Sequence, residues 1–394
     1  MFSFFNTKNH GFINRTTVMN KFLSLGGVFV AAALLSGCSD NELASVETSE
    51  MNAIGFHVVG SQAETKAIPT TPSNLKDTDF DVFAFTANGT AFMGKADTEF
   101  GHDGVNIKYK DGKWDYANES DRRYWPTEAL DFYAFNPGTI DEGMKGHYMW
   151  EADGTSQKIS YTCSDEYSKE SSTPGKNYDV MYAIAKDKTK DNTNGGKVNL
   201  QFKHILSQVV FKAKTQYDNM TVTINGIKIK YFRMGGTFTL PGDATTDPVQ
   251  SNWEFNTFQI TNGIFTVGMD NSPFSVTGTT IADISGSKPM LFIPQPLTAW
   301  DRTQPISQVD INKEQSYLEI SCKIQQSGSY LFGDATNFKK LYVPFGADWQ
   351  PGKRYIYTLI FGGGYDADGN AILTPIEFVP EVKDWVEESG NVDL

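Results

Sequence analysis

Hydrophobic and polar residues alternate in short runs along most of the chain. Residues 54–58, 105–109 and 227–231 are examples in which every second side chain is apolar or aromatic. A period of two is typical of a β-strand with one buried face. Stripes with the helical period of 3.6, sustained for more than about twelve residues, are hard to find. The pattern predicts an all-β fold built from many short strands.

Glycine-containing dipeptides separate several of these runs. Asn88-Gly89 and Asp111-Gly112 lie between neighbouring runs. Both dipeptides favour the positive φ angles of two-residue turns, so they predict tight hairpins. Asn225-Gly226 interrupts the run at residues 221–231. There the dipeptide fits either a further hairpin turn or a bulge within one strand.

A polar segment in the middle of the chain marks a domain boundary. Residues 186–197 have no apolar period and contain two consecutive glycines. Short strands at regular spacing favour β-sandwiches over barrels and α/β layers. We therefore expect an N-terminal β-sandwich over residues 51–196 and a C-terminal β-sandwich over residues 197–394.

The alternating pattern changes phase shortly after this boundary. Val198, Leu200 and Phe202 share one face and should line the interior of the C-terminal sandwich. The apolar residues within 209–213 follow the other phase. A change of phase inside one extended segment requires a bulge or bend. We expect that bulge near Ser207-Gln208.

The amino-terminal residues have the pattern of a secretory signal. Lys21 precedes an apolar run over residues 22–35, which is too short to span a bilayer comfortably. Met19 is the better start for such a signal. We expect residues 1–37 to be a signal peptide that is absent from the mature protein.

The end of the apolar run resembles a bacterial lipobox. Leu35 lies three residues before Cys38, and Ser36 and Gly37 are small enough to let a peptidase reach the backbone. The resemblance implies that the chain is cut before Cys38 and that Cys38 is acylated. It also implies a lipid anchor in the outer membrane. Several acyl chains on one residue hold a protein firmly, whereas a single chain binds only marginally.

Residues 38–50 should form a flexible tether. They include Asp40, Glu42, Glu47 and Glu50 and show no apolar period. Acidic residues just after a lipidated cysteine resemble the surface-export signal of lipoproteins in Gram-negative anaerobes, which implies exposure at the cell surface. A solvated linker explains the same residues equally well.

Composition removes several classes of function. The net charge is −13, and no basic stripe is interleaved with aromatic residues, so nucleic acid is excluded as a partner. Besides Cys38 the cysteines are Cys163 and Cys322, in different halves of the chain and without metal-ligand spacing. The histidines are scattered, and His204 should pack in the core as a hydrogen-bonded residue. We expect no metal site and no cofactor.

No arrangement of residues indicates catalysis. Asp131, Asp179 and Asp384 lie beside aromatic residues, where hydrogen bonding at turns and edges is the favoured role over catalysis or sugar binding. Residues 366–370 resemble a calcium loop but lack several ligands, so a hairpin turn is expected. Most of the seven tryptophans should lie in the core, with a sugar-stacking platform as the alternative. We expect a protein without enzymatic activity.

Several segments together resemble the fimbrillin-like surface lipoproteins of Gram-negative anaerobes. The resembling segments, in chain order, are residues 124–134, 178–183, 198–207, 349–357 and 382–385, together with the lipobox at Cys38. The resemblance implies two tandem transthyretin-like β-sandwich domains. It also implies a fimbrial subunit, anchor or tip adhesin, with a host or bacterial surface ligand. A surface lipoprotein that binds glycans is the alternative.

The same resemblance implies assembly with other fimbrial subunits by β-strand exchange. In such a mechanism an amino-terminal strand is cut away after a basic residue, and the strand of a partner takes its place. The corresponding strand here contains Ile54, Phe56 and Val58, and the basic residue after it is Lys66. The family usually has arginine at the cleavage position, so Lys66 departs from the pattern.

Overall fold

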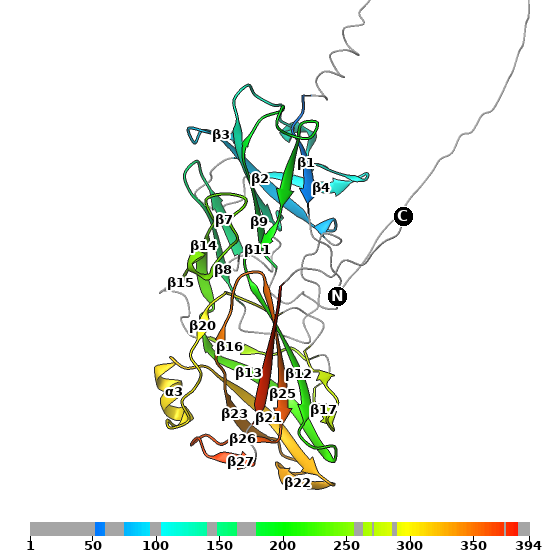
Figure 1. The fold of residues 1–394 in the computed structure, drawn as a ribbon, viewed down its shortest axis with the longest axis vertical. Coiled ribbons are helices and arrows are strands. Elements are labelled where there is room, and N and C mark those ends of the chain that lie inside the picture. Colours follow the sequence, from blue (N-terminus) through cyan, green and yellow to red (C-terminus); the bar gives the residue numbers. More distant parts are fainter. Residues whose placement is uncertain are drawn as a thin grey trace, which may run out of the picture. The chain divides into compact units, whose positions relative to one another are not determined.

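The computed structural model describes residues 52–59, 75–94, 104–139, 148–163, 179–255, 263–269, 272–285, 290–373 and 376–384. Within these ranges the chain forms β-strands with one α-helix, α3 (Ile306–Asn312), and two 3-10 turns, η1 (Glu119–Asp121) and η2 (Gln250–Asn252) (Figure 1). The expectation of an all-β fold is confirmed. Cys38 and Lys66 lie outside the described residues, as do the whole signal and the tether up to residue 50.

The largest sheet of the amino-terminal half has seven strands. Its order is β11-β9-β6-β2-β4-β5, with β3 paired to β2 on the side. The bounds are β2 (Asp79–Thr86), β3 (Ala91–Met93), β4 (Val105–Lys110), β5 (Lys113–Tyr116), β6 (Leu130–Asn136), β9 (Met181–Lys188) and β11 (Lys203–His204). Every residue of the central strand β2 is buried. This sheet is therefore covered on both faces.

The two faces of this sheet belong to different hydrophobic clusters. Successive side chains of a strand point to opposite faces. Accordingly Phe80 and Val82 of β2 lie in one cluster, while Phe83 and Phe85 lie in the other. The strands β6 and β9 divide their side chains in the same way. We call the cluster that contains Phe80 the first core and the cluster that contains Phe83 the second core.

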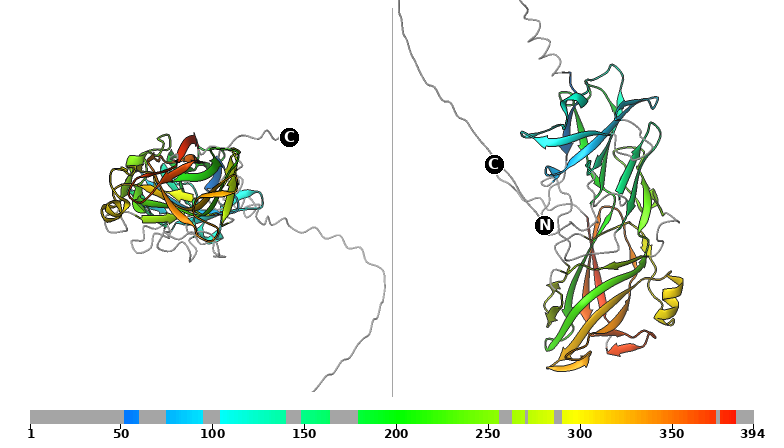
Figure 2. Two further views of the ribbon diagram at one scale, coloured as in Figure 1. Left: turned by 90° about the horizontal axis from the view of Figure 1, so that it is seen from below. Right: turned by 180° about the vertical axis from the view of Figure 1, so that it is seen from behind.

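A parallel pair of strands, β1 (Gly55–Val59) and β10 (Lys197–Gln201), closes the first core. The two lie side by side in the views from the front and from behind (Figure 1, Figure 2). Val198 and Leu200 are fully buried in the first core, and Phe202 packs partly buried against it, with its ring 5.2 Å from that of Phe80. The prediction that these three residues line a C-terminal core is therefore wrong. They pack with strands that precede residue 196.

The second core lies beneath a four-stranded sheet of order β15-β14-β8-β7. Its strands are β7 (Tyr148–Ala152), β8 (Gln157–Thr162), β14 (Gly235–Thr239) and β15 (Trp253–Phe255). The pairing of β8 with β14 joins segments from both sides of residue 196. The second core also continues into the carboxyl-terminal strands, for example to Tyr357. Hydrophobic packing is thus continuous across the boundary expected from the sequence.

The carboxyl-terminal half contains two further large sheets and a short pair. The five-stranded sheet has the order β18-β12-β25-β28, with β19 beside β12. The eight-stranded sheet has the order β16-β13-β21-β23-β26-β27, with β17 beside β13 and β22 beside β21. The bounds are β12 (Ser207–Thr215), β13 (Met220–Phe232), β16 (Gly263–Thr266), β17 (Phe274–Thr277), β18 (Ala282–Asp283), β19 (Met290–Phe292), β20 (Pro296–Leu297), β21 (Tyr317–Gln326), β22 (Ser329–Phe332), β23 (Lys339–Pro344), β24 (Ala347–Asp348), β25 (Lys353–Phe361), β26 (Gly363–Tyr365), β27 (Ala371–Leu373) and β28 (Glu377–Asp384). The short pair is β20 with β24.

The predicted hairpins are present. Strands β4 and β5 pair in an antiparallel hairpin, and its turn residues Asp111 and Gly112 have φ angles of 51° and 81°. Strand β3 pairs with β2 after the turn that contains Gly89. Around Asn225-Gly226 the chain stays in one strand, β13, whose register shifts between Ile224 and Gly226. The bulge, not the hairpin, is the correct alternative there.

The phase change near residue 207 has a different cause from the one predicted. The segment is not one strand with a bulge: β10, β11 and β12 lie in three different sheets. Strand β10 faces the first core, whereas Val209 and Phe211 of β12 face the second. The phase therefore changes because the chain passes from one sheet to another.

Candidate functional site

The candidate site is strand β1 and the place that it occupies at the first core. Ile54, just before the strand, and Phe56 within it have exposed fractions of 0% and 4%, and Val58 packs partly buried against the same cluster. For these three residues the family resemblance implied an exchangeable strand. The structure places all three on the apolar face of one extended segment.

Backbone hydrogen bonds hold this segment on two sides. On one side β1 pairs in parallel with β10, from Gly55 opposite Lys197 to Val59 opposite Gln201. On the other side, before the strand, Ile54 N donates to the carbonyl of Arg123 at 2.9 Å. A single antiparallel bridge joins Ala53 to Tyr124. Beyond Ile54 the segment is paired through its backbone to β10 alone among the described residues.

Phe56 is the largest side chain that β1 contributes to the first core. Its ring centroid lies 6.3 Å from that of Phe80, 6.0 Å from that of Tyr116 and 6.4 Å from that of Phe132. These three rings come from β2, β5 and β6. Aromatic pairs at such distances and tilts add to the stabilisation from apolar burial. Phe56 therefore anchors β1 in a socket made by three other strands.

Two glycines, Gly55 and Gly196, lie where β1 meets β10. A Cβ atom on Gly55 would lie 3.0 Å from the Cγ of Lys197. Gly196 has a φ of 77°, and its carbonyl accepts bonds from Gly55 N at 3.1 Å and from Trp125 Nε1 at 3.0 Å. Gly196, which lies in the segment expected to be a domain boundary, thus forms part of the site.

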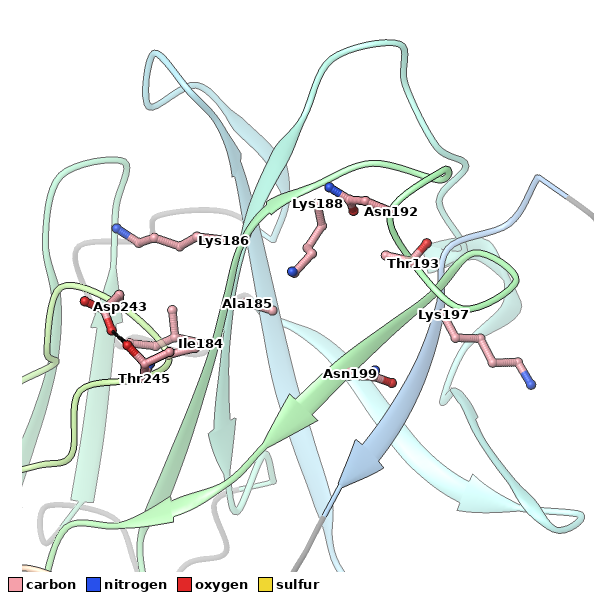
Figure 3. Close-up of a pocket in the computed structure, with 11 residues that line it drawn as sticks. Ile184, Ala185, Lys186, Lys188, Asn192, Thr193, Lys197, Asn199, Asp243 and Thr245 are labelled. Atoms are coloured by element: carbon pink, nitrogen blue, oxygen red, sulfur yellow. Dashed lines mark hydrogen bonds between the residues drawn. The ribbon is translucent and has the colours of Figure 1, made fainter.

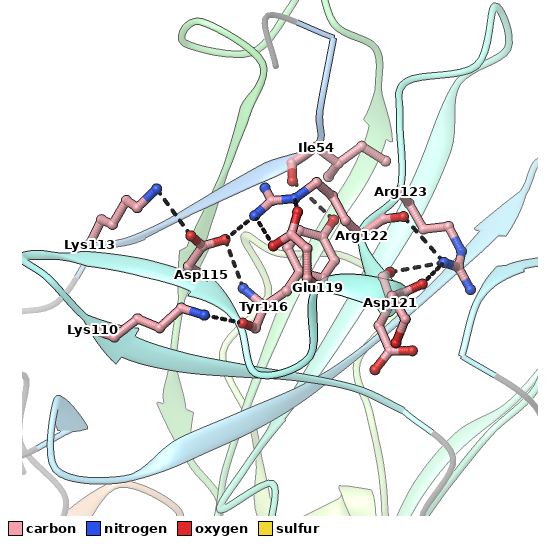
Figure 4. A network of polar contacts seen from close by, with 10 residues as sticks. Ile54, Lys110, Lys113, Asp115, Tyr116, Glu119, Asp121, Arg122 and Arg123 are labelled. Carbon is pink, nitrogen blue, oxygen red and sulfur yellow. Dashed lines mark hydrogen bonds and ion pairs between the residues drawn. The ribbon is translucent and has the colours of Figure 1, made fainter. Parts of the chain in front are cut away.

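A polar network lies at the amino-terminal end of β1 (Figure 4). The hydroxyl of Tyr116 donates a hydrogen bond of 3.0 Å to the carbonyl of Ile54. The guanidinium of Arg122 lies over the Tyr116 ring at 5.1 Å and pairs with Asp115 at 3.0 Å and with Glu119. Figure 4 shows these groups gathered beside Ile54. The network fixes the position of the Tyr116 ring, whose hydroxyl binds the carbonyl of Ile54 just before β1.

The protonation states in this network follow from its contacts. Burial raises the pKa of the Tyr116 hydroxyl to about 12, so the group remains a hydrogen-bond donor at neutral pH. For Asp115 burial acts to raise the pKa, but bonds from Lys113 and the Tyr116 N–H, together with the charge of Arg122, lower it below its ordinary value. The bond from Arg122 also lowers the pKa of Glu119. Both carboxylates are ionised at neutral pH.

Replacing Tyr116 by phenylalanine tests this network. The change removes one hydroxyl and deprives the Ile54 carbonyl of the hydrogen bond from Tyr116, so the free energy of unfolding should fall by about 1–3 kcal/mol. Amide hydrogen exchange of residues 54–58 should accelerate. Tyr109→Phe in the neighbouring strand β4 is the matched control. A Tyr116→Phe protein as stable as the control would show that the bond contributes nothing to holding β1.

The arrangement holds an extended segment through both its backbone and its side chains. A strand that pairs with one edge gains affinity from main-chain hydrogen bonds, and pockets for alternate side chains give specificity. Here the edge belongs to β10, and the pockets receive Ile54, Phe56 and Val58. In the structure the chain's own β1 fills this place.

Other residues singled out in the sequence have structural roles. His204 packs half-buried in β11, with its Nδ1 3.0 Å from the Oδ1 of the buried Asp179. Asp131 accepts a hydrogen bond from Asp187 N at 2.8 Å, and Asp384 pairs with Lys353. These contacts agree with the expectation of hydrogen bonding at edges and turns.

The remaining candidates for chemistry also lie in structural positions. Asp366 accepts backbone bonds inside the antiparallel hairpin of β26 and β27, as expected for a turn. Cys163 and Cys322 are buried free thiols. The tryptophans buried within the described ranges are Trp125, Trp150, Trp253, Trp300 and Trp349, while Trp114 is half-buried. These positions offer no exposed row of tryptophan rings for stacking on a sugar.

The described part of the chain contains neither a cluster of metal ligands nor a membrane-spanning helix. Within the described ranges no three His, Cys, Asp or Glu side chains gather closely enough to bind a metal ion. No helix in those ranges has the length and apolar character needed to cross a membrane.

Comparison with known proteins agrees with the fold and places the chain in a family. The profile of the family described as fimbrillin-like matches residues 65–385. Fimbrium subunit Fim1C of Phocaeicola vulgatus is 26% identical over 250 residues, which cover 57% of this chain and 60% of that protein. This chain thus matches about 60% of the length of its curated relative.

A solved structure supports the same fold. The crystal structure of a fimbrial protein from Bacteroides vulgatus aligns with a TM-score of 0.55 at 15% sequence identity. The alignment covers 85% of this chain and 100% of that chain. At this identity the likeness concerns the fold alone. The family profile, by contrast, covers most of the sequence, so this chain belongs to the fimbrillin-like family.

Proposed function

We propose that this protein is a non-enzymatic fimbrial subunit that joins other subunits by exchange of strand β1. Lipid on Cys38 anchors it in the outer membrane, and the fold is displayed at the cell surface. The observation that carries the proposal is the position of β1. The strand fills an apolar place at the first core, yet among the described residues it pairs through its backbone with β10 alone.

Strand exchange requires that a departing strand leave a place of defined shape. Without β1, the side chains of Phe80, Tyr116 and Phe132 would lose their contacts with Phe56. The edge of β10 would lose its ladder partner as well. An incoming extended segment with apolar residues at alternate positions restores both. Water can hydrogen-bond to the edge of β10, but it cannot replace the apolar contacts of Phe56.

Lys66 supplies the cleavage position in this proposal. It lies between the end of β1 at Val59 and the start of β2 at Asp79. Cutting there breaks the covalent link that keeps β1 at high effective concentration beside its own core. The strand would then be held by non-covalent contacts and could be replaced by the strand of another subunit. The relationship to a fimbrium subunit of P. vulgatus supports this assembly role.

The proposal predicts that exchange depends on cleavage. The purified protein is treated briefly with trypsin, and mass spectrometry identifies the cut after Lys66. A fluorescent peptide copying residues 52–60 is then added, and its incorporation is followed by anisotropy and native mass spectrometry. We expect incorporation into the cut protein and self-association of the cut protein as its concentration rises.

Two controls make the result specific. The Lys66→Gln variant should resist this cut and take up no peptide. A peptide carrying Phe56→Ser should exchange at least tenfold more weakly, since it cannot fill the aromatic socket. Protein that is demonstrably cut at Lys66, and yet stays monomeric and excludes the native peptide, would refute strand exchange.

A further inference from the structure

The face of β1 that points away from the first core is not equally open along its length. It carries Gly55, His57 and Val59, because successive residues of a strand point to opposite faces. His57 and Val59 are exposed, whereas Gly55 is half-buried. The residue opposite Gly55 in the ladder of β1 with β10 is Lys197. The restriction on this face therefore falls at one position of the strand.

Lys197 leaves little room for a side chain at Gly55. A Cβ atom there would lie 3.0 Å from Cγ of Lys197, 3.8 Å from its Cβ and 3.9 Å from its Cα. Carbon atoms in favourable contact are about 3.5–4.0 Å apart, so the first of these distances is a clash. Figure 3, a close-up of the cavity that Lys197 also lines, shows its side chain extending from the start of β10 past the blue strand β1.

The size of an added side chain decides what must move. Alanine at position 55 requires the Lys197 side chain to turn about its Cα–Cβ bond, which takes Cγ out of the contact at the cost of a change of rotamer. Valine brings two further methyl groups close to the Cα and Cβ of Lys197, which such a turn does not move. The place of β1 therefore favours glycine at this position and disfavours branched side chains.

Hydrogen bonds on both sides of the same segment depend on its direction. Before the strand, Trp125 N donates to the carbonyl of Asn52 at 3.0 Å, and Ile54 N donates to the carbonyl of Arg123 at 2.9 Å. These bonds belong to an antiparallel pair, whereas the ladder with β10 begins one residue later and is parallel. A strand inserted in the opposite direction would exchange the two patterns, which differ in the spacing and slant of their bonds.

We propose that the place of β1 selects its occupant by one glycine and by direction. It takes an extended strand that runs parallel to β10, with apolar side chains at three alternate positions and glycine between the first two. In this chain Ile54-Gly55-Phe56 carries the glycine signature. The inference rests on the proposed strand exchange, because it names the kind of partner strand that can be exchanged.

Peptides that differ at one residue test the glycine. Protein cut after Lys66 is titrated with labelled copies of residues 52–60, and binding is followed by anisotropy. We expect binding about threefold weaker with Gly55→Ala and at least tenfold weaker with Gly55→Val. His57→Val, on the same exposed face, is the matched control and should bind at least as tightly as the native peptide. Without the restriction Gly55→Val would also strengthen binding, since valine favours extended backbone and glycine does not.

A change in the acceptor shows whether Lys197 is responsible. Lys197→Ala removes Cγ and keeps Cβ, so this variant should bind the Gly55→Ala peptide at least as tightly as the native peptide. Asn199→Ala is the matched control, because Asn199 lies opposite His57 in the same ladder. It should keep the preference for glycine. The affinities of both peptides for both proteins give the coupling between the two positions.

A peptide of reversed sequence tests the direction. Inserted antiparallel to β10, it could place the same glycine and the same apolar side chains against the same neighbours. It should nevertheless bind at least tenfold more weakly than the native peptide. Its N–H and C=O groups would no longer match those of Arg123, Trp125 and Gly196.

The uncut protein tests the same contact without strand exchange. Gly55→Val should accelerate amide hydrogen exchange of residues 54–58 at least tenfold, whereas His57→Val should leave it unchanged. Gly55→Ala should accelerate it about threefold, and adding Lys197→Ala should restore the rate of the parent protein.

The outcomes distinguish this inference from the strand exchange on which it rests. If the cut protein takes up no peptide and the uncut variants behave as expected, exchange is refuted and the glycine rule holds for the chain's own strand. Equal binding of the native and Gly55→Val peptides, or uncut Gly55→Val protein that exchanges at the parent rate, overturns the glycine rule. Equal binding of the reversed peptide overturns the selection by direction.

Discussion

Replacing Phe56 by alanine should lower the free energy of unfolding by about 3–5 kcal/mol, as is usual for loss of a buried phenylalanine. Phe56 is 4% exposed and fills a socket formed by Phe80, Tyr116 and Phe132. These three residues lie on separate strands, so the socket cannot readily collapse, and a cavity should remain. Denaturation by urea, followed by tryptophan fluorescence, measures the change.

The matched control for Phe56→Ala is Val59→Ala in the same strand. Val59 is 43% exposed and points away from the first core, so its replacement should change stability by less than about 0.5 kcal/mol. Phe56→Ala should also speed the exchange of β1 for a peptide after cleavage at Lys66. Equal stabilities of the two variants would mean that β1 is not seated in the first core, and the proposed exchange site would be lost with it.

Replacing Cys38 by serine should transfer essentially all of the protein from the membrane fraction to the soluble fraction. Serine has no thiol for acylation, and each buried methylene of a lipid chain contributes about 0.8 kcal/mol to membrane binding. The acidic residues after Cys38 offer no apolar substitute. Metabolic labelling with an alkyne fatty acid, combined with fractionation, measures both effects.

The control for Cys38→Ser is Asn41→Gln, a conservative change in the tether that should leave labelling and membrane association unchanged. Fatty-acid label retained on the serine variant would show that acylation lies elsewhere. An unlabelled serine variant that still sediments with membranes would show that Cys38 is not the anchor. Either result would remove the lipidation step from the proposed function without touching strand exchange.

Alternation along the sequence was enough to predict the fold class and many of the strands. The hairpin at Asp111-Gly112 followed from local chemistry, because its positive φ angles suit those two residues wherever they lie. The family resemblance likewise pointed to Ile54, Phe56 and Val58 before their packing was known. These features depend on neighbouring residues, so they can be read from a linear pattern.

Predictions of which core a strand packs against, or which sheet it joins, were less successful. Val198 and Leu200 alternate as a buried strand should, but the alternation does not say which core receives them. The change of phase near Ser207 resembled a bulge, because a sequence does not show that a chain has moved to another sheet. The same limitation hid the parallel pairing of β10 with β1, which joins segments far apart in the sequence.

The sequence by itself determined that this protein is a β-protein of the fimbrillin-like family with an apolar, alternating segment at Ile54. Side-chain period and turn chemistry are local properties, and they are preserved in the folded state. Only the tertiary structure decided that β1 closes a core built from β2, β5 and β6, and that β10 pairs with β1 in parallel. Those features arise from pairing between distant segments. Such pairing is settled by which arrangement buries the most apolar surface while satisfying the backbone, and no local pattern records it.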